Sequence, residues 1–269
     1  MNNLSHQRGF VKVIATIFAV LSMSTYAEES EIPDSILGLA DEPRGVSFNY
    51  FEDAQGYLAE PTGEGPHGSV ILIHEWNGVV DRIRQVADSF AAEGYVALAA
   101  DLYSGRTGSN PRENMALVRE TLANPDQIVA NLDAAATYLR DREDTNDKVA
   151  TIGWCYGGGV ALSYALGGEH HEGTAIFYGR LIADPEQLKH LDHEIYGTFG
   201  ALDRGPSVEQ VNAFVAALRK ANIPNDVHIY DPVGHGFWLY VDRDEENARE
   251  PATHAWHRLK DYLDRTISD

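Results

Sequence analysis

The chain has 269 residues, of which 43% are hydrophobic and 10% aromatic, and it carries a formal net charge of −20. This length and composition predict a single sizeable globular domain and exclude a repetitive or low-complexity protein. The acidity argues against nucleic acid and anionic membranes as partners, because phosphate groups are bound by clustered Lys and Arg.

The first 27 residues are typical of a signal peptide. Arg8 and Lys12 form a basic start, residues 13–23 are apolar, and Thr25 and Ala27 suit cleavage after Ala27. The apolar stretch is too short to span a bilayer, and a membrane anchor or a buried first helix is the alternative. We therefore expect residues 1–27 to be removed. We expect residues 28–269 to form one exported domain, periplasmic or secreted, with no membrane association in the mature form.

Strand and helix patterns alternate along the mature chain. The alternation of apolar and polar residues over 46–58 predicts a hairpin at the edge of the sheet. Further strands are predicted at 69–74, 95–100, 148–152, 174–178, 195–201 and 227–230. Helices are predicted at 80–93, 111–123, 125–142, 160–166, 206–221 and 251–267, with Asn110 and Asn124 as N-caps. This order predicts an α/β fold, a mostly parallel sheet with helices on both faces. Ligands bind at the carboxyl ends of the strands of such a sheet.

The segment Gly153-Trp154-Cys155-Tyr156-Gly157 joins a predicted strand to a predicted helix. The pattern Gly-x-Cys-x-Gly is that of a nucleophile elbow, with sulfur in place of the usual serine oxygen. Its strained turn requires nearly side-chain-free neighbours, which Gly153 and Gly157 provide. Cys155 is the only cysteine, so an internal disulfide is excluded. An inert buried thiol and a disulfide between chains are the other interpretations.

Asp203 and His235 follow Cys155 in the chain order of α/β-hydrolases. His235 could take the thiol proton and Asp203 could orient the imidazole, although a turn-capping Asp and a structural His are the simpler alternatives. The amides of Tyr156 and Trp76 are the candidate oxyanion donors. These residues predict acyl transfer from an ester or lactone to water through a thioester.

Two further observations concern charge and metals. Glu75 directly follows an apolar strand, which favours a functional carboxylate over a surface one. His254 and His257 are spaced by three residues and could chelate a metal, but no Cys ligand accompanies them. We therefore expect no metal and no cofactor. We expect a monomer that acts on a small-molecule ester or lactone.

The chain resembles the dienelactone hydrolase family. The similar segments span nearly the whole mature chain in the right order and are His74-Glu75-Trp76-Asn77-Gly78, Asp101-Leu102-Tyr103-Ser104-Gly105-Arg106, Gly153-Trp154-Cys155-Tyr156-Gly157-Gly158, Gly200-Ala201-Leu202-Asp203 and Gly234-His235-Gly236-Phe237. The resemblance implies an α/β-hydrolase fold and a catalytic triad of Cys155, His235 and Asp203. It also implies that Glu75 contacts the thiol in the resting site and helps to generate the thiolate once substrate binds.

Family members that cleave dienelactone bind the substrate carboxylate with two arginines. The resemblance implies that Arg106 is one of them, whereas the second position is occupied by Leu239. Together with Trp238, Trp76 and Tyr156, this departure implies an aromatic and more apolar pocket. We expect a broad range of esters and lactones without a strict need for a substrate carboxylate. The alternative is a non-catalytic binding protein on the same scaffold.

Overall fold

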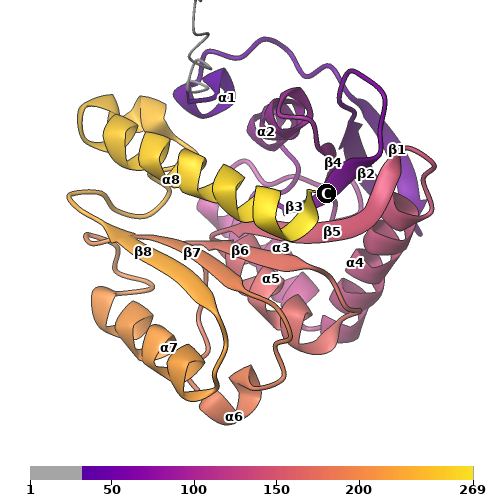
Figure 1. Ribbon diagram of the computed structural model, residues 1–269. Coiled ribbons are helices and arrows are strands. Elements are labelled where there is room, and N and C mark those ends of the chain that lie inside the picture. The colour runs from indigo at the N-terminus through magenta and orange to yellow at the C-terminus, as the bar shows by residue number, and fades with distance from the viewer. Residues whose placement is uncertain (1–31, 269) are drawn as a thin grey trace, which may run out of the picture. The chain divides into compact units, whose positions relative to one another are not determined.

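An eight-stranded sheet forms the centre of the protein (Figure 1). The computed structural model describes residues 32–268, and the predicted signal peptide over residues 1–27 lies outside them. Within the described residues the strand order is β1-β2-β4-β3-β5-β6-β7-β8. The strands are β1 (Val46–Phe51), β2 (Ala54–Ala59), β3 (His67–Ile73), β4 (Val96–Ala100), β5 (Thr145–Trp154), β6 (Gly173–Phe177), β7 (Ile195–Gly200) and β8 (Asn225–Tyr230).

The sheet is parallel from β4 to β8, and β2 pairs antiparallel with both β1 and β4. The predicted edge hairpin and the mostly parallel sheet are therefore confirmed. The central strands β3 and β4 are almost wholly apolar because both of their faces are buried, and Val70 to Ile73 are inaccessible to solvent. Each such aliphatic side chain stabilises the fold by about 1.5–3 kcal/mol.

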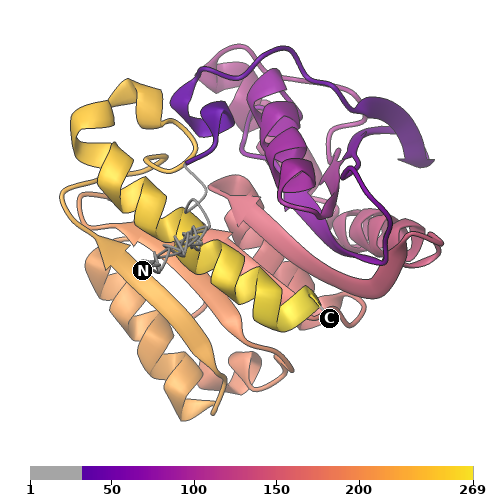
Figure 2. The same ribbon diagram turned by 45° about the horizontal axis from the view of Figure 1, so that its top comes forward.

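Helices cover both faces of the sheet (Figures 1 and 2). Helices α2 and α8 lie on one face, and α4, α5 and α7 lie on the other. The helices are α1 (Asp34–Leu37), α2 (Asp81–Ala92), α3 (Pro111–Leu122), α4 (Pro125–Arg140), α5 (Tyr156–Gly167), α6 (Pro185–Leu188), α7 (Val208–Lys220) and α8 (Glu245–Ile267), with a 3-10 turn η1 (Val241–Arg243).

Helices α5 and α8 begin earlier than predicted, α5 at Tyr156 and not at residue 160, and the expected cap of α4 is not formed. Asn110 caps α3 by accepting from the amides of Arg112 and Glu113, as expected, but Asn124 makes no such bond at α4. The Asn124 side chain instead donates to the carbonyl of Glu120. Helix α8 begins at Glu245 and contains Pro251, so a proline taken as the first helical residue lies inside the helix. Local cap patterns therefore located the helices but not each first residue.

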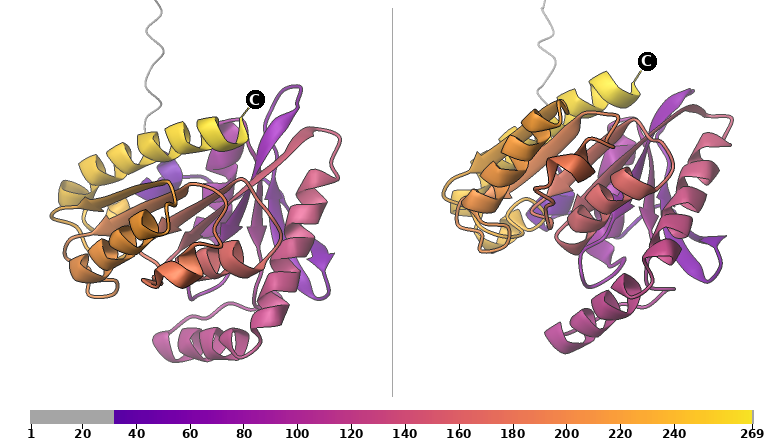
Figure 3. Two further views of the ribbon diagram at one scale, coloured as in Figure 1. Left: turned by 60° about the horizontal axis from the view of Figure 1, so that its bottom comes forward. Right: turned by 90° about the horizontal axis from the view of Figure 1, so that it is seen from below.

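Helix α3 stands apart from the main body (Figure 3). Only Asn114 and Leu117 of this helix are buried, and Met115 and Leu122 are 38% and 52% exposed. Among residues 32–268, every helix is too short or too polar to cross a lipid bilayer.

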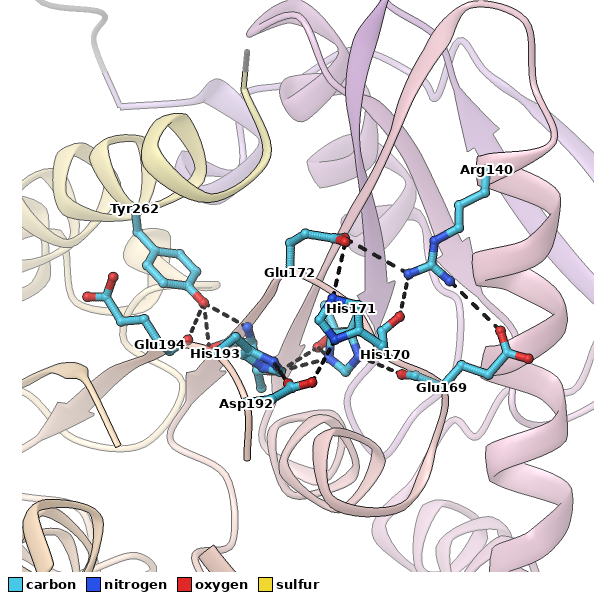
Figure 4. Close-up of polar contacts among 11 residues, drawn as sticks. Arg140, Glu169, His170, His171, Glu172, Asp192, His193, Glu194 and Tyr262 are labelled. Atoms are coloured by element: carbon cyan, nitrogen blue, oxygen red, sulfur yellow. Dashed lines mark hydrogen bonds and ion pairs between the residues drawn. The ribbon is translucent and has the colours of Figure 1, made fainter. Parts of the chain in front are cut away.

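A histidine cluster lies at the amino ends of β6 and β7, the edge opposite to Cys155 (Figure 4). The Nε2 atoms of His171 and His193 lie 2.9 and 2.8 Å from the Oγ1 atom of Thr174. Asp192 contacts His193 Nδ1 at 2.9 Å, and the Tyr262 hydroxyl accepts from the Thr174 amide at 2.7 Å. The Tyr262 bond ties α8 to the sheet, and both histidines pack against the same threonine, which indicates a structural role for His171 and His193.

The stability of the protein should depend on pH through His171. Burial, with a smaller contribution from the charge of His193, lowers the pKa of His171 from 6.5 to about 4. Because the folded pKa lies below the unfolded one, the stabilisation by neutral His171 is complete above pH 6.5 and is lost as the pH falls toward 4. We expect the free energy of unfolding to fall by on the order of 3 kcal/mol on this account.

Urea denaturation at a series of pH values measures this effect. His171→Gln should flatten the pH dependence between pH 4 and 6.5, whereas a matched change at the exposed His190 should leave it as it is. An undiminished acid slope in His171→Gln would contradict the assignment.

Candidate active site

Cys155 sits at the turn between β5 and α5 with φ 55° and ψ −114°. A positive φ is uncommon for a residue with a side chain, and such strain clusters at functional sites. The turn is held by two backbone bonds. The Cys155 amide donates to Phe177 at 2.9 Å, and its carbonyl accepts from Gly159 at 3.3 Å. The strand, turn and helix expected of a nucleophile elbow are therefore present.

The glycines on either side of the turn are sterically required. A Cβ atom at Gly153 would lie 2.1 Å from the carbonyl oxygen of Gly157. A Cβ atom at Gly157 would lie 2.1 Å from the carbonyl oxygen of Ile73, which ends β3. No side chain fits at either distance, so the predicted need for glycine at both positions is confirmed.

His235 and Asp203 form a charged pair beside the elbow. His235 follows β8, Asp203 follows β7, and the Nδ1 and Oδ2 atoms are 2.7 Å apart. The Asp203 side chain is only 4% exposed, and its other oxygen accepts from the Gly205 amide at 2.9 Å. A carboxylate at Nδ1 fixes the tautomer and leaves Nε2 to serve a nucleophile.

The electrostatics of the site favour a charged imidazole. Burial by itself would lower the pKa of His235, but bonding to Asp203 and Cys155 and the charges of both raise it to about 10. His235 is therefore an imidazolium at neutral pH beside the sulfur of Cys155. A neighbouring imidazolium stabilises a thiolate, which is the competent nucleophile.

Glu75 lies beneath this pair and is 5% exposed. Burial raises the pKa of the Glu75 carboxyl, and a contact with the Tyr240 hydroxyl and the charges of His235 and Arg243 oppose this rise. Glu75 is thus part of the buried polar cluster around His235. Its hydrogen-bonding neighbour is a tyrosine.

A cavity of about 640 Å³ opens on the nucleophile. Four of the predicted site residues line it, namely Cys155, His235, Trp76 and Tyr156. Tyr156 is the first residue of α5, where amides have no partner within the helix, so its N–H is free to bind an oxyanion.

Arg106, Trp238 and Leu239 do not reach this cavity. Arg106 makes a bidentate pair with Glu120 at 3.0 and 2.7 Å and lines a separate cavity of about 140 Å³. Trp238 and Leu239 are wholly buried, and Trp238 stacks on Trp154 at a ring distance of 5.8 Å. The structure thus places all three predicted substrate contacts outside the cavity lining, because one side chain is neutralised elsewhere and two belong to the core.

Other residues line the cavity where Arg106, Trp238 and Leu239 were expected. The segment after β6 contributes Tyr178, Arg180 and Leu181, and α3 contributes Met115 and Val118. Tyr178, Arg180 and Leu181 directly follow the carboxyl end of β6, and this position could have marked them as site residues in the sequence, since ligands bind at such ends. The α3 contacts had no signal in the sequence. Among the described residues of the lining, Arg180 is the only Lys or Arg, and none is Asp or Glu.

Among residues 32–268, no group of three or more His, Cys, Asp or Glu side chains is arranged to hold a metal ion.

Comparison with known proteins places this geometry in a family. The sequence pattern of the dienelactone hydrolase family matches residues 54–267. A protein of Methylorubrum extorquens assigned as a carboxymethylenebutenolidase is 29% identical over 77% of this chain and 75% of its own. One from Escherichia coli K12, assigned likewise, is 27% identical over 79% of this chain and 82% of its own.

Solved structures agree. The crystal structure of a protein of Klebsiella pneumoniae assigned as a dienelactone hydrolase matches with a TM-score of 0.68 and 25% identity. The match covers 78% of this chain and 92% of that one. The α/β-hydrolase fold and the match over most of the sequence agree, and the chain belongs to the dienelactone hydrolase family of ester-hydrolysing enzymes.

Proposed function

We propose that this enzyme hydrolyses carboxylic esters or lactones through a thioester on Cys155. The observation that carries the proposal is the His235–Asp203 pair, 2.7 Å long, beside a cysteine held in a strained turn at the floor of a cavity. This arrangement meets the geometric requirements for an activated nucleophile with an oriented base.

In the first half of the reaction, the Cys155 thiolate attacks the carbonyl carbon and a tetrahedral oxyanion forms. The amides of Tyr156 and Trp76 stabilise the oxyanion. The C–O bond of the ester then breaks, the leaving alkoxide takes a proton from the His235 imidazolium, and a thioester remains. In a lactone the alcohol stays attached to the acyl chain.

In the second half, neutral His235 takes a proton from water, and the hydroxide attacks the thioester carbon. The C–S bond breaks, which releases the carboxylic acid and regenerates the thiolate beside an imidazolium. Asp203 accepts a hydrogen bond from the Nδ1–H group of His235 throughout and favours the charged imidazole.

Replacing the nucleophile tests the proposal. Cys155→Ala should lower kcat for a short-chain p-nitrophenyl ester by about 10⁴-fold or more, since a missing nucleophile removes the covalent pathway. Because Cys155 is the only cysteine, one equivalent of iodoacetamide should also inactivate the protein. Unchanged turnover in Cys155→Ala would refute the mechanism, and a slow, substrate-independent alkylation would favour a non-catalytic binding protein.

We further propose that Arg180 gives the site its response to substrate charge. Within residues 32–268 its guanidinium forms no ion pair, whereas Arg106 is neutralised by Glu120. A single arginine can attract an anionic group but does not form a two-arginine clamp, so neutral esters and lactones should also be substrates.

Arg180→Gln should therefore lower kcat/KM for a carboxylate-bearing ester by about 10- to 100-fold, the effect of one charge-assisted hydrogen bond. Turnover of the neutral methyl ester of the same compound should change by less than about threefold. Arg106→Gln is the matched control and should affect neither substrate. An equal loss on both substrates would assign Arg180 a structural role.

We also propose export of the mature enzyme and action as a monomer. The basic and apolar pattern of residues 1–27 supports export. N-terminal sequencing of exported protein should find Glu28 first, and a chain that still begins at Met1 would contradict removal of the segment. Light scattering measures the oligomeric state, and a dimeric mass would contradict the monomer.

A further inference from the structure

Two tyrosine hydroxyls flank the buried carboxyl of Glu75, and the reaction described above uses neither. Tyr178 follows β6 and Tyr240 follows β8, so they reach Glu75 from different strands. The charge of Glu75 acts on both phenols. Together they form a polar cluster directly beneath Cys155 and His235.

Tyr240 is the hydroxyl that contacts Glu75 in this structure. Its ring lies between two guanidinium groups, with Arg243 at 3.5 Å and Arg82 at 5.2 Å from the ring centroid. Burial and the Glu75 charge raise the pKa of Tyr240 far above its ordinary value, so the hydroxyl keeps its proton and donates. Cations over the ring strengthen a phenol as a donor, because they withdraw electron density from it.

Tyr178 is a second donor whose proton is unused. The residue is 1% exposed, and its backbone is held at φ 40° by a 2.9 Å bond from its amide to Thr198. The Leu239 amide lies beside its oxygen, but among residues 32–268 its hydroxyl proton has no acceptor. A buried donor without an acceptor is unfavourable, so such a group needs an explanation.

The proposed reaction explains why Tyr178 keeps a hydroxyl without an acceptor. Burial raises the pKa of the Glu75 carboxyl, and the positive charge of His235 opposes this rise and so favours the anion. When the imidazolium gives its proton to the leaving group, that charge disappears for as long as the thioester lasts. The buried carboxylate then needs another favourable contact, because an uncompensated buried charge is costly.

We propose that Tyr178 and Tyr240 are positioning residues for Glu75. Tyr240 holds the carboxylate in the free enzyme, and Tyr178 donates to it while His235 is neutral. This inference depends on the proposed thioester pathway. Glu75 thereby keeps its charge and place throughout the cycle, and the neutral His235 remains free to deprotonate water.

The two tyrosines should differ kinetically. Tyr178→Phe keeps the ring that packs 4.9 Å from His235 and removes only the donor, so it should slow thioester hydrolysis. We expect kcat and KM for a p-nitrophenyl ester to fall together by about tenfold, with kcat/KM within about twofold of wild type. A burst of one p-nitrophenol per chain should appear. Tyr240→Phe should instead lower kcat/KM, since it acts on the free enzyme.

Tyr164→Phe is the control, because within residues 32–268 this buried hydroxyl also lacks a hydrogen bond of good geometry, although the charge of Asp133 acts on it. Its ring packs on His171, away from the cavity. This variant should change neither constant. The melting temperature of Tyr178→Phe should equal or exceed that of wild type, as expected when an unpartnered hydroxyl is removed. A lower melting temperature with proportional losses in kcat and kcat/KM would assign Tyr178 a purely structural role.

A double-mutant cycle with Glu75→Gln tests whether Tyr178 acts on the reaction through Glu75. If Tyr178 acts through Glu75, then Tyr178→Phe should cause no further loss in the Glu75→Gln background. The same tenfold loss there would overturn the inference. If Glu75→Gln is inactive, the cycle cannot be measured and the single variant Tyr178→Phe tests the inference. A burst with a joint fall of kcat and KM supports it, and the absence of both contradicts it. Activity that survives Cys155→Ala would refute the thioester pathway itself, whereas an inactive Cys155→Ala with an unaffected Tyr178→Phe would refute only this inference.

Discussion

The close approach of Gly157 to the end of β3 is the constraint on which the site depends. A Cβ atom at position 157 would lie 2.1 Å from the Ile73 carbonyl, so the first turn of α5 rests directly on the strand beside β5. This contact brings the loop that carries Glu75 and Trp76 next to Cys155. Without it, Cys155, the amides of Trp76 and Tyr156 and the buried carboxyl of Glu75 would not lie together. The strained φ of Cys155 follows from the same packing.

The charge distribution follows from this arrangement. The chain carries a net charge of −20, but among residues 32–268 no Asp or Glu lines the cavity at Cys155. Asp203 and Glu75, which carry the two carboxyls near His235, are buried residues, 9% and 5% exposed as a whole, and lie outside the cavity lining. Carboxylates buried at this depth stabilise the His235 imidazolium without repelling an anionic substrate, because they are withdrawn from the surface that the substrate meets.

The sequence predicted the sheet and the strand, turn and helix around Cys155 well, since both depend on local patterns. Apolar runs mark buried strands, and Gly-x-Cys-x-Gly fits one backbone geometry. The substrate contacts were predicted poorly because they depend on tertiary packing. Arg106 is paired with Glu120 of α3, and no local pattern shows where that helix lies. Trp238 stacks on Trp154 because the chain turns inward after His235, and this turn has no sequence signature.

Leu239 occupies the position at which a second substrate-binding arginine was expected, and it belongs to the core. Its side chain is wholly buried, and its carbonyl accepts a 3.4 Å bond from Arg82 of α2. Arg82 is also anchored by Asp242 at 3.0 Å and extends toward the ring of Tyr240. Arg82 and Arg243 therefore both lie over the ring of Tyr240, whose hydroxyl contacts Glu75. Within residues 32–268, the positive charge in the cavity lining comes from Arg180 and His235, and none comes from the position that Leu239 occupies.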